Sequence, residues 1–158
     1  MYVLYRIKKI PMKYYEALRE LWENFDPFVH IKKEEVVDET ELFFVIPARA
    51  PYVPDHLLII PKRKVYVLKH MTPDERLEMY ELVEKWALKL HKNHKDVNLL
   101  LRDGLVWQTS WKSVNHLHFH LIPDCEVTTE KLFSSGDREF FDDEKYAALS
   151  ESIRNMYI

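Results

Sequence analysis

Polar and apolar side chains alternate between positions 113 and 123, where three histidines are separated by single large apolar residues. Successive side chains of a β-strand point to opposite faces, so this pattern predicts a strand with His116, His118 and His120 on one face. The apolar residues between them would then face the core. Pro123 ends the run.

Other apolar runs predict the rest of a sheet. Residues 42–46, 56–60 and 97–101 are continuous apolar segments of strand length, and the first two are each followed by a proline. Two weaker patterns predict a short strand at 2–7 and an edge strand at 32–38, where charged residues flank two valines.

The best helix signal begins at Thr72. Thr72 is suited to the N-cap, Pro73 to the first helical position, and Glu75 completes a capping box. We expect this long helix to end near Asn93. Its apolar stripe is predicted to consist of Leu77, Tyr80, Val83, Ala87 and Leu90.

Two shorter helices are predicted nearer the ends of the chain. The first follows Pro11 and stops at Asp26-Pro27, and the second lies in the C-terminal tail. The residues at helical spacing are Tyr14, Leu18, Leu21, Trp22 and Phe25 in the first, and Tyr146, Leu149, Ile153 and Met156 in the second.

Composition narrows the class of protein. The chain has 158 residues, which predicts a single domain over 1–158, and its net charge of -3 gives no basic field for an extended nucleic acid. The lone Cys125 excludes an intramolecular disulfide, and no apolar stretch approaches membrane-spanning length. We therefore expect a soluble, cytoplasmic protein. Only two glycines occur, so a glycine-rich phosphate loop is absent.

A metal site is one interpretation of the three histidines, because imidazole is a common metal ligand. Along an extended strand the Cα atoms of His116 and His120 would lie roughly 13 Å apart, too far for all three rings to converge easily on one ion. Two of them could bind a metal, but the third would then need another purpose. We expect no metal and no other cofactor.

Nucleophilic catalysis accounts for all three. A neutral imidazole can attack an electrophile without an activating base if its other nitrogen is held in the correct tautomer. His118 is the natural nucleophile because a histidine flanks it on each side. These neighbours would orient it and donate hydrogen bonds to charge developing at phosphorus.

These residues resemble the histidine triad (HIT) superfamily, whose signature is His-x-His-x-His with hydrophobic x. The likeness extends from about 42 to 123. Residues 54–61 are similar to the family's Pro-Gly-His strand, and Asp103-Gly104 resembles the turn before the triad. The resemblance implies an α+β fold with about five antiparallel strands, a long helix and a shorter N-terminal helix, assembled as a homodimer. Residues 125–158 would form a C-terminal extension.

The resemblance also implies roles for four histidines. His118 matches the family nucleophile, which forms a nucleotidyl-histidine intermediate. His116 matches the buried histidine that orders the site, and His120 matches the one that contacts phosphate. His56 matches a fourth histidine that supports the triad.

Further candidates lie on the loop that leads into the triad. Ser113 stands where the family has a phosphate-contacting Ser or Thr, and Arg102 where some dinucleoside polyphosphate hydrolases have a glutamine. Trp111-Lys112 replaces the usual Gly-Gln, so Trp111 would narrow the pocket or stack on a purine, and Lys112 would supply charge in place of backbone amides. Asp55 replaces the glycine before His56, either as a turn residue or as a carboxylate that repels an anionic substrate.

The resemblance implies hydrolysis or transfer at the α-phosphate of a nucleotide conjugate. Two alternatives remain open at this point. The altered loop would also suit a catalytically weakened, nucleotide-binding regulatory protein, and the histidines would suit a metalloprotein. Turnover of a nucleotide would indicate the enzyme, nucleotide binding without turnover the regulatory protein, and metal retained after purification the metalloprotein.

Overall fold

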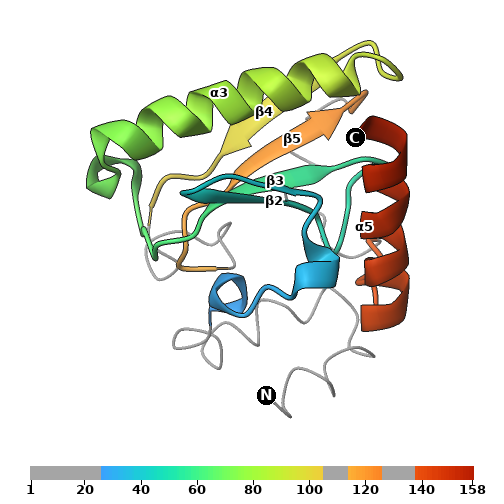
Figure 1. Ribbon diagram of the computed structural model, residues 1–158, viewed down its shortest axis with the longest axis horizontal. Helices are drawn as coiled ribbons and strands as arrows, with labels where there is room; N and C mark the ends of the chain where they lie inside the picture. The colour runs from blue at the N-terminus through green and yellow to red at the C-terminus, as the bar shows by residue number, and fades with distance from the viewer. Residues whose placement is uncertain (1–25, 105–113, 126–137) are drawn as a thin grey trace.

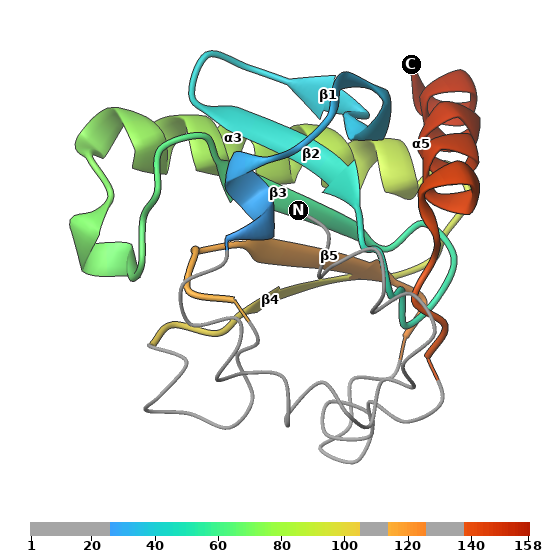
Figure 2. The ribbon, with the colours of Figure 1, turned by 90° about the horizontal axis from the view of Figure 1, so that it is seen from below.

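The computed structural model describes residues 26–104, 114–125 and 138–158. Five strands form one antiparallel sheet in the order β1-β2-β3-β5-β4, which Figure 2 shows with the helix α3 behind it. The strands are β1 (Asp38–Glu39), β2 (Phe43–Pro47), β3 (Leu57–Pro61), β4 (Val97–Leu101) and β5 (Phe119–Pro123). The expected α+β architecture is confirmed. The strand expected at 2–7 and the N-terminal helix fall outside the described residues.

The long helix α3 (Pro73–Leu90) begins as its sequence predicts. The Thr72 hydroxyl accepts from the Glu75 amide at 3.2 Å, and the Glu75 carboxylate accepts from the Thr72 amide at 2.8 Å. These bonds satisfy amide donors that a helix start would otherwise leave unpaired. The helix lies across one face of the sheet (Figure 1).

The predicted apolar stripe of α3 is only partly confirmed. Leu90 is buried and Val83 packs against the core, but Leu77 and Tyr80 are 62% and 65% exposed. Leu82 and Trp86, which the prediction left out, are buried. The Trp86 indole donates to the Asp38 carboxylate at 2.9 Å, so the bulkiest side chain of the helix is fixed against the sheet edge. Burial of that large ring sets the rotation of the helix.

The main core lies between α3 and the sheet. Paired residues of β3 and β5 contribute to it, with Leu57 opposite Leu121 and Ile59 opposite Phe119. The C-terminal helix α5 (Asp143–Tyr157) closes one side of this core with Ile153 and Tyr157. The expected C-terminal helix is therefore present, with Tyr157 buried and Met156 53% exposed.

The opposite face of the sheet carries a smaller apolar cluster, to which Ile46, Leu58 and Ile60 belong. The short 3-10 helix η2 (Pro27–Val29) packs on this face through Phe28. Since Leu58 pairs with His120, the histidines of β5 belong to this side of the sheet rather than to the α3 side.

Two strand predictions need correction. Residues Lys33–Glu35 form the 3-10 helix η3, because the Glu35 carboxylate accepts from the Lys32 amide at 3.0 Å and favours a turn. The edge strand is thus only β1. Likewise β5 begins at Phe119, and the Leu117 amide donates to the Val65 carbonyl at 2.6 Å instead of to a neighbouring strand.

A further 3-10 turn, η4 (Leu68–His70), leads into α3. Within the described part of the chain, no helix has the length and apolarity needed to cross a membrane.

Candidate active site

Three histidine rings lie side by side on the sheet face opposite α3. The ring centroids of His118 and His120 are 4.9 Å apart, and those of His120 and His56 are 5.2 Å apart. His120 is on β5, His118 directly precedes that strand, and His56 directly precedes β3. Antiparallel pairing of β3 and β5 therefore brings His56 to the triad.

A chain of hydrogen bonds fixes the tautomers of His56 and His120. The backbone amide of Tyr52 donates to His56 Nδ1 at 3.3 Å, so that nitrogen carries a lone pair. His56 Nε2 then carries the proton and donates to His120 Nδ1 at 2.9 Å. Consequently His120 holds its own proton on Nε2, where it is a hydrogen-bond donor.

Both of these histidines are neutral at pH 7. Burial lowers the pKa of His56 to about 3, with the positive charge of Arg138, and that of His118 when its ring is protonated, adding to the effect. Burial likewise sets the pKa of His120 well below its usual value, assisted by His118, His56, Arg102 and Arg138. Neutrality preserves the directed N–H···N bond between the two rings.

His118 has the tautomer that a nucleophile requires. Its Nδ1 lies 2.8 Å from the backbone carbonyl of His116, which can only accept, so Nδ1 carries the proton. The lone pair is therefore on Nε2. A neutral imidazole with this arrangement can attack an electrophile directly.

His116 is fully buried. Its Nδ1 lies 2.6 Å from the Asp26 carboxylate and its Nε2 lies 2.7 Å from the Pro61 carbonyl. Burial alone would raise the pKa of Asp26, but the hydrogen bond and charge of His116, with smaller contributions from the Phe28 amide and Lys64, lower it. Each ring nitrogen of His116 thus lies within hydrogen-bond distance of an oxygen atom, and the two contacts fix the orientation of the ring.

Phe28 covers one side of this arrangement. Its ring makes edge contacts with His116 at 5.7 Å and with His118 at 5.1 Å between centroids. The contact restricts rotation of the His118 ring and excludes water from that side. The segment that carries Asp26 and Phe28 thus supports two histidines.

Arg102 follows the last residue of β4. Leu100 pairs with His120 and Leu101 with Phe119, so continuing the alternation puts Arg102 on the same face as His118 and His120. Its charge contributes to the lowered pKa of His120. The other loop candidates, Trp111, Lys112 and Ser113, lie outside the described residues.

Asp55 lies in the turn that leads into β3. Its φ of 62° is left-handed, a conformation that glycine adopts easily and that aspartate tolerates better than most residues. Its carboxylate accepts from the Tyr157 hydroxyl at 2.6 Å and pairs with His94 Nε2 at 2.7 Å. These contacts fit the interpretation of Asp55 as a turn residue.

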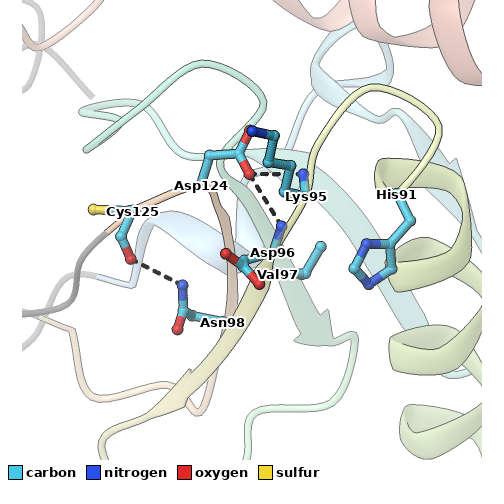
Figure 3. Close-up of a pocket in the computed structure, with 7 residues that line it drawn as sticks. All are labelled: His91, Lys95, Asp96, Val97, Asn98, Asp124 and Cys125. Carbon is cyan, nitrogen blue, oxygen red and sulfur yellow. Dashed lines mark hydrogen bonds between the residues drawn. The ribbon is translucent and has the colours of Figure 1, made fainter.

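A surface hollow lies at the other end of β5, away from His118. Figure 3 shows the Asp124 carboxylate accepting from the Lys95 and Asp96 amides at 2.8 and 3.0 Å. Among the described residues, no group of three or more His, Cys, Asp or Glu side chains is placed to hold a metal ion. The hollow is lined by His91, Lys95, Asp96, Val97, Asn98, Asp124 and Cys125.

Three residues that contact the histidines were not predicted to do so from the sequence: Asp26, Phe28 and Tyr52. Arg138, which stacks on Tyr52, was not predicted either. In the sequence, Asp26-Pro27 marks only the end of a helix, and Tyr52 is only an aromatic residue that could stack on a purine. The contacts of Asp26 and Arg138 join segments far apart in the chain, which local periodicity does not reveal.

Comparison with known proteins agrees with this geometry. The HIT domain model matches residues 30–127. Bis(5'-adenosyl)-triphosphatase of Dictyostelium discoideum is 29% identical over 63% of this chain and 65% of its own length. A bifunctional bis(5'-adenosyl)-triphosphatase/adenylylsulfatase of Arabidopsis thaliana is 28% identical over 84% of this chain and 67% of its own length. The chain thus spans about two thirds of these two curated relatives.

The fold also matches solved structures. A hypothetical histidine triad nucleotide-binding protein of Sulfolobus tokodaii superposes with a TM-score of 0.63 at 24% identity, covering 83% of this chain and 91% of the other. The family match includes β1 to β5, α3 and all four histidines of the site. The chain belongs to the HIT domain family.

Proposed function

We propose that this chain is a nucleotide hydrolase or transferase. It acts at the α-phosphate of a nucleotide conjugate, a dinucleoside polyphosphate or a nucleoside phosphoramidate, through a nucleotidyl-histidine intermediate on His118. The observation that carries the proposal is the pair of tautomers, a lone pair on His118 Nε2 beside a proton on His120 Nε2. The names of the two triphosphatase relatives support this substrate class.

The first step is attack by His118. The Nε2 lone pair forms a bond to phosphorus, and the bond to the leaving group breaks with its electron pair going to the leaving group. Positive charge appears on the His118 ring, where Nδ1–H donates to the His116 carbonyl. The His120 Nε2–H donates to a phosphoryl oxygen, as pre-oriented donors do in phosphoryl transfer.

The second step restores the enzyme. Water, or an acceptor hydroxyl, attacks the phosphorus and releases its proton to solvent. The P–N bond breaks and its electron pair returns to His118 Nε2. Arg102 supplies positive charge on the same face for the anionic groups.

The test is detection of the intermediate. The protein is mixed with dinucleoside polyphosphates and adenosine phosphoramidates, quenched in alkali, and examined by intact mass and by nucleotide analysis. We expect a nucleotidyl adduct and turnover in the wild type, and neither in His118→Ala. Absence of turnover across the panel in folded wild-type protein would overturn the proposal.

A matched control separates the role of His118 from a general effect of removing an imidazole. His91 is an exposed histidine at the end of α3. We expect His91→Ala to keep the adduct and the wild-type rate. Nucleotide binding by the wild type without turnover would instead favour a regulatory binding protein.

A further inference from the structure

The C-terminal extension lies against the connection between β2 and β3. The Phe141 amide donates to the Arg49 carbonyl at 2.9 Å, and Arg49 Nε donates back to the Phe141 carbonyl at 3.0 Å. The Tyr146 hydroxyl donates to the Pro47 carbonyl at 2.6 Å. These bonds bring Arg138 to the residues that precede His56.

Arg138 makes a hydrogen bond and a stacking contact there. Its Nη1 donates to the Ala50 carbonyl at 2.9 Å, and its guanidinium carbon lies 4.0 Å from the centroid of the Tyr52 ring. Arginine is suited to this position because its planar group can stack on an aromatic ring while its N–H groups donate in the same plane.

Tyr52 connects Arg138 to the site in two ways. Its ring stacks on His56, with centroids 5.4 Å apart and planes inclined by 25°. Its backbone amide is the donor to His56 Nδ1, at 3.3 Å. A hydrogen bond of this length is near the long end of the usual range, so a small shift of the loop that carries Tyr52 would weaken it. Arg138, Tyr52, His56 and His120 thus form a continuous series of stacked or hydrogen-bonded planar groups.

The tautomer of His56 depends on that amide. Without it, a proton on Nδ1 would leave Nε2 to accept from His120 Nδ1–H. His120 Nε2 would then carry a lone pair toward the phosphoryl oxygens, and an attractive contact would become repulsive.

We infer that Arg138 is a positioning residue of the histidine site. It holds Tyr52 so that His56 donates to His120, and His120 presents Nε2–H to the phosphoryl oxygen. The inference deepens the proposed function and rests on it for the catalytic role of His120. The arrangement of protons that it requires exists without substrate.

The test uses Arg138→Gln, Arg138→Lys and a matched control, Arg154→Gln. Arg154 also belongs to the C-terminal extension and also binds a backbone carbonyl, that of Val36 at 2.7 Å, but just after η3 rather than beside the histidines. The readout is the ¹⁵N NMR spectrum of the histidine rings in the full, ligand-free chain. In the wild type we expect protons on Nε2 of His56 and His120.

In Arg138→Gln we expect the proton of His56 to be shared between the two nitrogens. We also expect the pKa of His56 to rise from about 3, because the positive charge of Arg138 helps to lower it. Arg138→Lys retains the charge but loses the stacked plane, so the tautomers change while the titration stays near that of the wild type. Unchanged tautomers in both folded variants would overturn the inference.

Kinetics give the second readout. We expect kcat to fall about 10- to 100-fold in Arg138→Gln with little change in KM, because ground-state binding persists while the donor is misaligned. Arg154→Gln should keep both tautomers and kcat. If Arg138→Lys restored full activity, charge alone would explain the effect and the positioning role would be wrong. If the proposed function is wrong, the wild-type protein will be inactive while its histidines still show the expected tautomers.

Discussion

The buried pair of His116 and Asp26 supports His118, the proposed nucleophile. His116 supplies the carbonyl that fixes the proton on His118 Nδ1, and both of its own nitrogens are held at 2.6 and 2.7 Å. Movement of this one residue would therefore alter the tautomer and the direction of His118. The pair thus connects the proposed catalytic group to the stability of the fold.

We expect Asp26→Asn to destabilise the fold by about 1.5–3 kcal/mol, the usual contribution of a hydrogen bond to a charged group. Because the pKa of Asp26 is lowered in the folded protein, its contribution is present above the unfolded pKa of about 3.9 and is lost as pH falls through the native value. Urea unfolding at pH 7, 5 and 3 should show a difference between wild type and variant that shrinks only at the lowest pH.

Lys64 provides the control for this measurement. It lies 3.7 Å from the same carboxylate but is 37% exposed. We expect Lys64→Gln to cost at most about 1 kcal/mol, as for exposed ion pairs. An equal cost for both variants would mean that Asp26 does not act through buried His116.

Only part of this site could be predicted from its residues. His118 and His120 are two positions apart on one face, so alternation alone brings them together. Asp26 lies 90 positions from His116, and Arg138 lies 88 positions from Ala50. Such contacts follow from the three-dimensional path of the chain, and neither periodicity nor residue type indicates them.

At the scale of elements, His94 connects α3, β3 and β5. His94, just after α3, pairs through Nε2 with Asp55 before β3 and through Nδ1 with Asp124 after β5, at 2.7 and 2.9 Å. The Tyr157 hydroxyl of α5 binds the same Asp55 carboxylate. The partners of His94 lie 30 and 39 positions away in the chain, so local sequence patterns do not indicate this bridge.

We expect this bridge to make stability depend on pH. Burial would lower the pKa of His94, but the hydrogen bonds and charges of Asp55 and Asp124 outweigh it and raise the pKa. The contribution is therefore complete below the unfolded pKa of about 6.5 and is lost as pH rises through the higher native value. His94→Gln should lower Tm by about 5 °C at pH 6 and by less at pH 9.

Exposed His70 is the matched control for thermal unfolding at the two pH values. His70→Gln should leave Tm within about 1 °C of wild type at both, as expected for a surface substitution. A constant difference for His94→Gln across the pH range would show that the bridge contributes through packing rather than through its charge.

The positions of helices and strands were easier to predict from the sequence than the side of a helix that is buried. Local chemistry at Thr72 and Glu75 predicted where α3 begins, because a capping box is complete within one turn. Which side of α3 is buried depends on how Trp86 reaches Asp38, 48 positions away. The predicted stripe contained Leu90 but neither Leu82 nor Trp86, and tertiary packing decided which of these side chains are buried.

At the scale of the whole molecule, β4 is an edge strand of the described sheet, and Leu99 on it is 54% exposed. Leu99 pairs with Leu121, so its side chain is on the face of the sheet that α3 covers. Leu77, Tyr80 and Leu88 of α3 are exposed as well. An exposed apolar residue on an edge strand suits association with a second copy.

We therefore expect a homodimer that joins through this edge. Leu99→Glu should shift the protein to monomer in sedimentation velocity, because a buried carboxylate would oppose pairing. Met156, also exposed and apolar but on α5, gives the control: Met156→Glu should remain dimeric. A monomeric wild type at micromolar concentration would contradict the expectation.

The contact of Arg138 with the loop before His56 has a consequence for protein synthesis. Asp26 and His56 leave the ribosome before their partners His116 and His120, and Arg138 follows after all of them. The site therefore cannot be completed before position 138 has emerged. A nascent chain halted before position 138 would carry all four histidines and still lack the residue that orients two of them.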